Sequence, residues 1–268
     1  MWLVTCLCGI GAEGATAASR IVSLDYCADQ FVLKFAQKDS IVGLSPDAAR
    51  DFSYMRAEAF GMPTVRPIAE DVIIVKPDLV VRSYGGNAGI VALLKRFGVP
   101  VLQLGYAEKL ADVRQNILHM SAGLGSAAAG RILVEQMDER LRIAAATKST
   151  NTDSLRALYM TPGGVTSGPN TLVHEMIQAA GYLNYQAQPG WHELPLERLI
   201  FDSPELVAMA YFEKQTDQVN SWSAMRHPVA RRQLQKAVVI PMQGAWTACG
   251  GWFLMDAIEK MQAALVSP

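Results

Sequence analysis

The residues of this chain best suited to chemistry are aromatic side chains that follow predicted strands. In parallel α/β structures, ligands bind beyond the carboxyl ends of the strands, so the residues after each strand are candidates. A cleft lined by several aromatic faces and few charges suits a large, flat or aromatic ligand better than a sugar or an amino acid. The candidates are Asp25, Tyr26, Tyr54, Arg82, Tyr84 and Tyr106 in the first half and Thr161, Pro162, Trp191, Phe212 and Trp246 in the second.

Three of these candidates are the most informative. Trp191 and Trp246 lie in segments rich in Gly and Pro, where no regular apolar period supports burial. Arg82 favours an anionic partner, such as a catecholate, a carboxylate or a propionate, if it points into the cleft. The alternative for Arg82 is a salt bridge at the rim. A lone aromatic residue usually packs in the core, so core packing stays open for the other aromatic candidates.

Histidine is too scarce for a bare metal-ion site. Of the four His residues only His192 is well placed for the cleft, so three or four converging ligands cannot be assembled from histidine. A haem needs a single axial ligand, which Tyr26, Tyr84 or His192 could supply. The chain has no Gly-x-Ser-x-Gly elbow, phosphate-binding loop or dinucleotide fingerprint. We therefore expect no enzyme activity, and no cofactor other than a metal within the bound ligand.

Short runs of β-branched and apolar residues alternate with helical stretches after Arg20. Such runs are typical of buried parallel strands. They lie at 21–24, 41–44, 78–81 and 99–102, and again at 155–160, 206–212 and 238–242. Between the two groups, residues 126–147 are strong helix formers with one early Gly and no Pro, which predicts one long helix.

This alternation predicts an α/β fold with two Rossmann-like lobes, each on a parallel sheet. A single long helix joins the lobes. The predicted parts are a signal peptide at 1–18, an N-terminal lobe at 19–122, an interlobe helix at 123–148 and a C-terminal lobe at 149–268. The first part is a short apolar stretch followed by small residues up to Ala18, which is typical of a cleaved secretory signal, although its start has no Lys or Arg. A buried core segment is the alternative.

The charge balance argues against nucleic-acid binding. Lys and Arg number 24 against 25 Asp and Glu, so no basic field attracts nucleic acid or an anionic membrane. After the first dozen residues, no apolar run approaches the roughly 20 residues that cross a bilayer. Signal cleavage would leave Cys27 and Cys249, which we expect to be two buried thiols, with a disulfide as the alternative.

A sequence repeat relates the two halves. The segment Glu-Asp-Val-Ile-Ile-Val-Lys-Pro-Asp-Leu-Val at 70–80 parallels Glu-Arg-Leu-Ile-Phe-Asp-Ser-Pro-Glu-Leu-Val at 197–207. Each segment begins with a Glu, and each predicts a short helix that ends before a Pro and is followed by a strand. Pro ends helices in any α/β protein, but a Glu at the same offset in both halves favours true pseudo-symmetry.

From Arg20 onward the chain resembles the periplasmic binding proteins for cobalamin and ferric siderophores. The resemblance is strong at 76–80, Lys-Pro-Asp-Leu-Val, and at the Gly-Gly-Asn-Ala segment that begins at 85. It continues through Thr-Ser-Gly at 166–168 and Ala-Gly-Tyr-Leu-Asn at 180–184. One departure is that cobalamin binders tend to have a Trp just before the Gly-Gly-Asn segment, where this chain has Arg-Ser-Tyr.

The resemblance implies a rigid interlobe helix, a ligand cleft between the two Rossmann-like lobes, and a function in transport as a monomer in the periplasm. In that family, one exposed Glu on each lobe docks into arginine pockets of two permease subunits, and the matching residues are Glu70 and Glu197. A Glu that opens a helix also complements the helix dipole, which is the alternative role. The implied protein captures a metal chelate, cobalamin or a ferric siderophore, and delivers it to the permease dimer of an ABC importer in the inner membrane. A receptor of the same architecture for haem, or for zinc or manganese ions, is the alternative.

Overall fold

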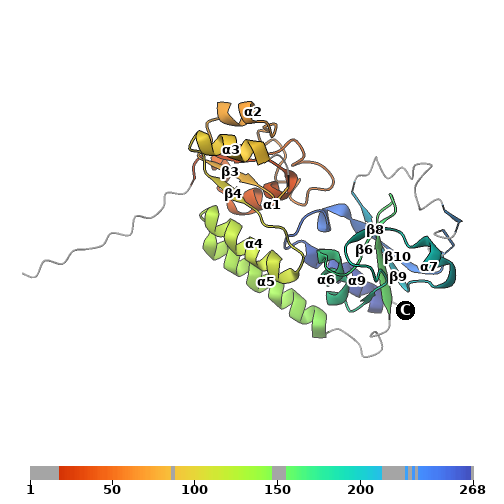
Figure 1. Cartoon of the computed structure of the whole chain (residues 1–268). Coiled ribbons are helices and arrows are strands. Elements are labelled where there is room, and N and C mark those ends of the chain that lie inside the picture. Colours follow the sequence, from red (N-terminus) through yellow and green to blue (C-terminus); the bar gives the residue numbers. More distant parts are fainter. Residues whose placement is uncertain are drawn as a thin grey trace, which may run out of the picture.

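The computed structural model describes residues 18–85, 88–146, 155–212, 227–228, 231–232 and 235–266. Apart from Ala18, the predicted signal segment lies outside these ranges. The described chain forms two α/β lobes beside a pair of long helices (Figure 1). Within these ranges, no helix combines the length and the apolar character that a membrane crossing requires.

The N-terminal lobe is built on a parallel sheet with the strand order β2-β1-β3-β4. Ile21 and Val81 enter the main core, while Val22 and Val80 enter a second core on the other face. Burial on both faces explains why these strands have continuous apolar sequences. The four predicted strands are confirmed, with bounds β1 (Ile21–Ser23), β2 (Ile41–Gly43), β3 (Leu79–Arg82) and β4 (Val101–Gln103).

Helices cover both faces of this sheet. Phe31 and Phe35 of the helix after β1 are buried in the main core, and Ile90 and Leu94 of the helix after β3 are buried in the second core. A short helix precedes β3 and contacts the helix after it (Figure 1). These helical elements are α1 (Tyr26–Phe35), η1 (Lys38–Ser40), α2 (Ala69–Ile74) and α3 (Ala88–Arg96).

The C-terminal lobe has a parallel sheet with the order β10-β9-β5-β7 and a separate antiparallel ribbon of two strands, β6 and β8. The three predicted strands are confirmed, whereas β7 and the ribbon were not predicted. The strands are β5 (Arg156–Met160), β6 (Val165–Ser167), β7 (Leu183–Asn184), β8 (Trp191–Glu193), β9 (Leu206–Tyr211) and β10 (Val238–Gln243). The helical elements are α6 (Leu172–Ala179), α7 (Leu196–Phe201), η4 (Gly244–Trp246) and α9 (Leu254–Val266).

The two parallel sheets have the same strand order. Read from its other edge, the second sheet has the order β7-β5-β9-β10, which corresponds strand by strand to β2-β1-β3-β4 of the first. The same match pairs α2, which precedes β3, with α7, which precedes β9. These are the segments that hold the sequence repeat, so the predicted pseudo-symmetry is confirmed.

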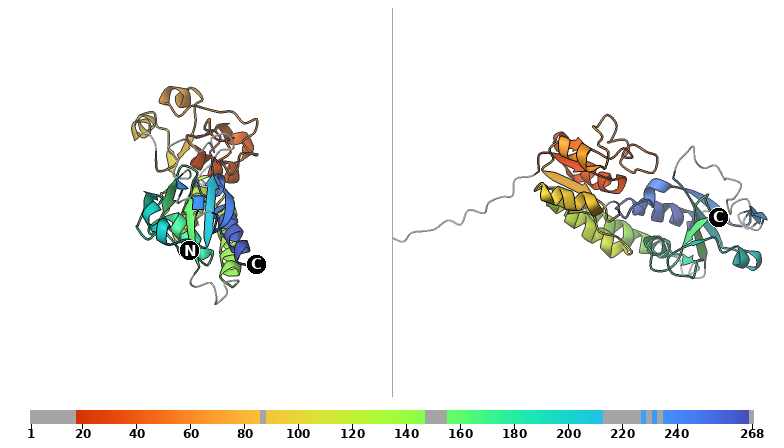
Figure 2. Two further views of the ribbon diagram at one scale, coloured as in Figure 1. Left: turned by 90° about the vertical axis from the view of Figure 1, so that its right-hand side faces the viewer. Right: turned by 45° about the horizontal axis from the view of Figure 1, so that its top comes forward.

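Two helices run beside the lobes, α4 (Leu110–Gly123) and α5 (Ala127–Ala146). They pack closely against each other, and a side chain at Gly130 would put its Cβ 1.8 Å from the Ser121 hydroxyl oxygen. The 20 residues of α5 span about 30 Å, and the helix runs from the first lobe to the second (Figure 2). The long helix predicted at 126–147 is therefore present.

A second contact joins the lobes in addition to α5. Trp252 and Phe253, just before α9, pack against the N-terminal lobe, with ring centroids 5.5 Å from Phe31 and 4.8 Å from Tyr54, respectively. The Tyr54 hydroxyl donates a hydrogen bond of 2.9 Å to Asp256 of α9. The main core thus continues from one lobe into the other.

A disulfide also links the lobes, so the expectation of two separate thiols is wrong. Cys27 in the first turn of α1 is bonded to Cys249, which lies between η4 and α9. The two residues are 222 positions apart, and only the fold brings their Cα atoms to 5.6 Å. Such a bond persists in an oxidising compartment.

Breaking this disulfide is expected to lower the free energy of unfolding by about 2–5 kcal/mol, because the bond restricts a long loop of the unfolded chain. The measurement is urea unfolding with and without a reductant. The double variant Cys27→Ser, Cys249→Ser is the control, because its unfolding midpoint should not respond to the reductant. Equal midpoints for the oxidised and the reduced wild-type protein would contradict the prediction.

Candidate ligand-binding cleft

A hollow of about 460 Å³ lies at the carboxyl ends of β1, β2 and β3, where the strand-end rule places ligands. Its volume is within the range of roughly 300–1,000 Å³ that is usual for small-molecule sites. The polar and aromatic side chains that line it are those of Asp25, Tyr26, Ser45, Asp47, Arg82 and Ser83. Three of the predicted ligand-binding positions therefore meet at one hollow.

Asp25 holds two turns of this hollow together. One of its carboxylate oxygens accepts a hydrogen bond of 3.0 Å from the backbone N–H of Ala28 and so caps α1. The other accepts a bond of 2.7 Å from the backbone N–H of Ser83, just after β3. The carboxylate thus fixes the distance between the ends of β1 and β3.

Arg82 ends β3 and is only 6% exposed. Its guanidinium donates hydrogen bonds to the backbone carbonyls of Ser83, at 3.0 Å, and of Gly85. These contacts shape the turn that holds Tyr84, and the role of Arg82 toward an anionic ligand stays a prediction. Because Arg82 also lines the hollow, it places a positive charge at its wall.

Tyr84 and Tyr106 follow β3 and β4 and lie against each other. Their ring centroids are 4.7 Å apart in an edge-to-face arrangement, and both side chains are about half exposed, at 50% and 51%. Partial burial raises the pKa of the Tyr84 hydroxyl, and the nearby phenol of Tyr106 raises it further by a smaller amount. The phenol therefore stays protonated at neutral pH and can donate a hydrogen bond.

Trp191 faces this pair from the C-terminal lobe. A smaller hollow of about 140 Å³ is lined by Tyr84 and Tyr106 from one lobe and by Trp191 and Thr247 from the other. Trp191 is half exposed, and its ring contacts the buried ring of Tyr159 with centroids 6.0 Å apart. Aromatic residues of both lobes thus line one cleft.

A family comparison identifies the class of protein with this architecture. The sequence profile of the periplasmic binding proteins matches residues 21–221. The chain belongs to this periplasmic binding protein family. Within the family, a curated relative, the cobalamin-binding protein of Halobacterium salinarum, is 27% identical over 199 residues, which are 70% of this chain and 53% of that protein. This chain thus spans about half the length of that relative.

Solved structures of other periplasmic binding proteins share the fold. The periplasmic heme-binding protein RhuT from Roseiflexus sp. RS-1 superposes with a TM-score of 0.73 at 20% identity, over 92% of this chain and 99% of that one. The periplasmic vitamin B12 binding protein BtuF of Vibrio cholerae gives 0.68 at 19% identity, over 93% and 97%. The two-lobed architecture is therefore a family property.

Tyr26, which lines the first hollow, lies at the start of α1 with its ring centroid 4.8 Å from that of Phe52. The remaining predicted ligand-binding residues of this periplasmic binding protein are dispersed, and Tyr54 is in the interlobe contact described above. Phe212 and Trp246 are partly buried and pack against the main core. Their ligand roles remain predictions. Thr161 and Pro162 form the turn between β5 and β6, where the Thr161 hydroxyl accepts a hydrogen bond from the backbone of Val165.

The positions of the histidines bear on whether the chain could bind a bare metal ion. The ring of His174 is hydrogen-bonded to Asn184, and that of His192 lies 2.8 Å from the carbonyl oxygen of Pro189. His192, the histidine predicted for the cleft, instead lines a separate hollow of the C-terminal lobe together with Glu197. Among the residues that the structure describes, no three His, Cys, Asp or Glu side chains are grouped as a metal site requires.

The sequence reasoning missed the floor of the cleft. This floor is formed by Thr247, Ala248, Cys249 and Gly250, a segment after η4 with no strand or helix pattern. Cys249 offered the available signal, because a pair of cysteines in a secreted chain is a candidate disulfide. Placing that pair beside the aromatic residues required the three-dimensional fold.

A buried carboxylate supports the first hollow. Asp29 of α1 accepts hydrogen bonds from the backbone N–H and the hydroxyl of Ser45, at 3.1 and 2.5 Å, and Ser45 lines the hollow. Burial raises the pKa of Asp29 to about 7, against the effect of the hydrogen bonds from Ser23 and Ser45. The folded protein therefore binds a proton at Asp29 more tightly than the unfolded chain does.

This raised pKa predicts a pH-dependent stability. The stabilising effect of the proton on Asp29 is complete below the ordinary carboxyl pKa of 3.8 and is lost as the pH rises through about 7. The free energy of unfolding of the wild type, relative to Asp29→Asn, should fall over that interval. Urea unfolding from about pH 4 to pH 8 measures it, with Asp39→Asn at an exposed site as the control. Parallel pH profiles for the wild type and Asp29→Asn would refute the assignment.

Proposed function

We propose that this periplasmic binding protein is the receptor of an ABC importer for a bulky metal chelate, with cobalamin or a ferric siderophore as the ligand. The observation that supports it most directly is the aromatic cleft, in which Tyr84 and Tyr106 of one lobe face Trp191 of the other. Flat aromatic faces on two sides suit a large ring-shaped or aromatic ligand. The likeness to a cobalamin-binding protein supports cobalamin within this class.

The size of the cleft agrees with a ligand that contacts both lobes. The hollow beside Trp191 measures only about 140 Å³, whereas the neighbouring hollow at the strand ends measures about 460 Å³. The turn after β3 borders both, with Ser83 in one lining and Tyr84 in the other. A chelate would lie across this turn, with its edge against Trp191 and Arg82 near any anionic substituent.

Haem is the second candidate, and the exposed phenols favour it. Tyr84 and Tyr106 both present half-exposed side chains in the cleft, and a single tyrosine can serve as an axial ligand of haem iron. In this alternative the propionates would meet the positive charge of Arg82. Neither ligand has to be chemically altered by the protein, so we propose capture and delivery without catalysis, by a monomer in the periplasm.

A fluorescence titration tests the ligand class. Purified mature protein is titrated with cyanocobalamin, ferric siderophores, haemin and zinc chloride, with correction for ligand absorbance. Saturable quenching by one chelate at a low concentration is expected, because Trp191 lies in the cleft. Binding of zinc alone would move the protein to the bare metal-ion receptors and refute the proposal.

Substitution of the cleft aromatic residues should weaken chelate binding. Trp191→Ala and Tyr84→Ala are each expected to raise Kd by about tenfold or more, because central aromatic anchors supply most of the affinity of a site. Phe97→Ala is the matched control, because Phe97 is 59% exposed at the end of α3, outside the residues that line either hollow. Equal chelate affinities of Trp191→Ala and the wild type would show that the chelate does not bind against Trp191 in this cleft.

Delivery is proposed to use Glu70 and Glu197. Both side chains are exposed in the first turns of the pseudo-equivalent helices α2 and α7. A carboxylate on each lobe can pair with a basic pocket on each subunit of a two-fold symmetric permease. The energy for transport would come from the ATPase subunits of the importer.

Loss of these two carboxylates should separate uptake from binding. The double variant Glu70→Ala, Glu197→Ala is expected to abolish uptake of the labelled chelate in cells that lack the chromosomal copy of the gene, while Kd in solution stays within about twofold of the wild type. The reason is that both residues lie outside the cleft lining. A parallel loss of affinity would show that the docking assignment is wrong.

A further inference from the structure

The helices α2 and α7 expose an apolar side chain one turn after the Glu. Counting from Glu70, the residue two positions on is buried Val72 and the residue four positions on is Ile74, which is 75% exposed. Counting from Glu197 in the same way gives buried Leu199 and then Phe201, which is 89% exposed. Residues four apart share a helix face, so each Glu and its apolar neighbour form one outward patch. We name the pairs Glu70 with Ile74 and Glu197 with Phe201 the docking patches.

An arginine side chain donates hydrogen bonds to backbone carbonyls at the carboxyl end of α2, and another does so just after α7. Arg20, just before β1, donates hydrogen bonds of 2.6 Å to the carbonyl of Val75 and of 3.0 Å to that of Lys76, at the end of α2. Arg156, at the start of β5, donates a bond of 2.7 Å to the carbonyl of Ser203, after α7. Two equivalent arginines therefore hold two equivalent helices.

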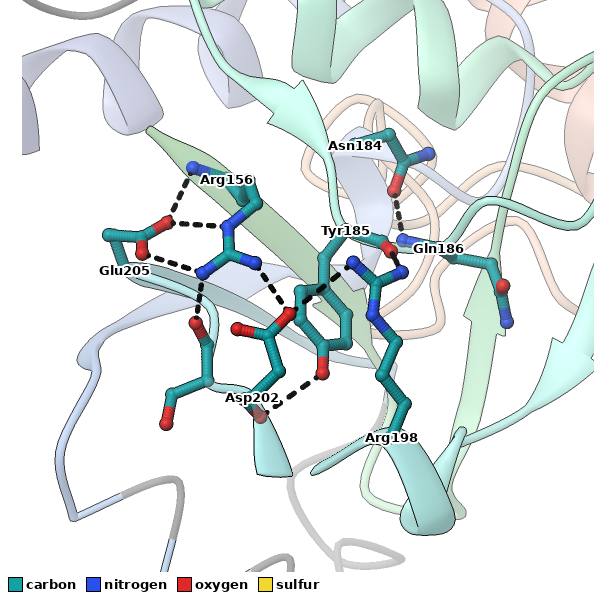
Figure 3. Close-up of polar contacts among 8 residues, drawn as sticks. Arg156, Asn184, Tyr185, Gln186, Arg198, Asp202 and Glu205 are labelled. Carbon is teal, nitrogen blue, oxygen red and sulfur yellow. Dashed lines mark hydrogen bonds and ion pairs between the residues drawn. The ribbon is translucent and has the colours of Figure 1, made fainter. Parts of the chain in front are cut away.

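Acidic residues complete this anchor in both lobes. The carboxylate of Asp78 accepts the backbone N–H of Arg20 at 3.0 Å, and that of Glu205 accepts the backbone N–H of Arg156 at 2.7 Å. Figure 3 shows Arg156 between Glu205 and Asp202, beside the ring of Tyr185. The helix ends are thus tied to the central strands, so the patches keep a fixed orientation on their lobes.

The charged residues that follow the two glutamates directly, Asp71 and Arg198, make contacts within their own lobes. Asp71 pairs with Arg66 at 2.6 Å, and Arg198 lies against the Tyr185 ring at 4.1 Å and donates to the Tyr185 carbonyl. In contrast, neither Glu70 nor Glu197 has a hydrogen-bond or ion-pair partner for its side chain among the residues that the structure describes. Each patch therefore offers one free carboxylate beside one bare apolar side chain.

We propose that Ile74 and Phe201 are contact residues for the membrane partner, so that each docking patch binds through a carboxylate and an apolar anchor together. This inference rests on the proposed function. The partner that fits is a two-fold symmetric membrane protein, each of whose subunits presents a basic side chain beside an apolar hollow. Burial of the apolar anchor excludes water from the neighbouring ion pair and strengthens it.

The repetition of the patches identifies this partner over a second copy of the chain. Each patch has the same order of Glu, buried residue and exposed apolar residue, on helices that the two lobes hold at equivalent places. Two like patches on one chain match two like sites on one symmetric partner. In Figure 1, α2 and α7 both lie at the outer parts of their lobes, away from α5.

The test is uptake of the labelled chelate identified by the titration, in cells lacking the chromosomal gene and complemented with variants. Ile74→Ser and Phe201→Ser are each expected to lower uptake about tenfold, and the double variant further, with Kd for the chelate unchanged. Ile74→Leu and Phe201→Leu should retain uptake, because they keep an apolar anchor. Phe97→Ser and Leu183→Ser, at other exposed apolar positions, are the matched controls and should transport normally.

Each other result would overturn this inference in a distinct way. Normal uptake by Ile74→Ser and Phe201→Ser, while Glu70→Ala with Glu197→Ala abolishes it, would leave the carboxylate docking intact and remove the apolar anchors. Normal uptake by all of these variants would remove the docking part of the proposed function as well. A monomer–dimer equilibrium in sedimentation that Phe201→Ser abolishes would assign the patch to a second copy of the chain.

Discussion

The packing between the lobes is the constraint on which the rest of the structure depends. A single core runs from Phe31 in the first lobe to Met261 in α9, with Trp252 as the ring where the two lobes meet. The disulfide at Cys27 and the ion pairs of Arg140 on α5 with Asp256 and Glu259 of α9 add to this contact. These contacts restrict the movement of the two lobes relative to each other. Preorganisation of this kind avoids the entropy loss of ordering two lobes on binding.

This constraint decides how the cleft can select a ligand. With the lobes held by a core, a helix and a disulfide, the distance between the turn of Tyr84 and the ribbon of Trp191 is set mainly by the protein. The ribbon itself is fixed by close backbone contact, since a Cβ at Gly168 would lie 1.8 Å from the carbonyl oxygen of Gln188. Selection by size and by flat shape then follows from rigid walls, whereas a small polar solute would require lobes that close around it.

The sequence was sufficient for the elements whose pattern is local. Continuous apolar runs at β1, β3 and β9 predict parallel strands because each face of those strands is buried, and the strand-end rule correctly brought Tyr84 and Tyr106 together. It was insufficient where the contact is long-range. The bond between Cys27 and Cys249, and the place of Tyr54 against Phe253, depend on how α9 packs under the first lobe. The guanidinium of Arg82 donates a hydrogen bond to the carbonyl of the next residue in its own loop, and the sequence pattern did not predict this side-chain direction.

The two lobes share their strand order and the helices α2 and α7, but they differ in the residues that line the cleft. The strand order and the arginine anchors of Arg20 and Arg156 occur twice, and so do the helices with their exposed glutamates. The strand ends that line the cleft do not match, since the first lobe supplies a tyrosine pair and the second supplies Trp191 from a ribbon without a counterpart. Under the proposed function, a two-fold symmetric permease would require equal surfaces on the two lobes, whereas a chelate without that symmetry would require unequal cleft walls. That difference would explain why the repeat is visible in the sequence at α2 and α7 and not at the residues that line the cleft.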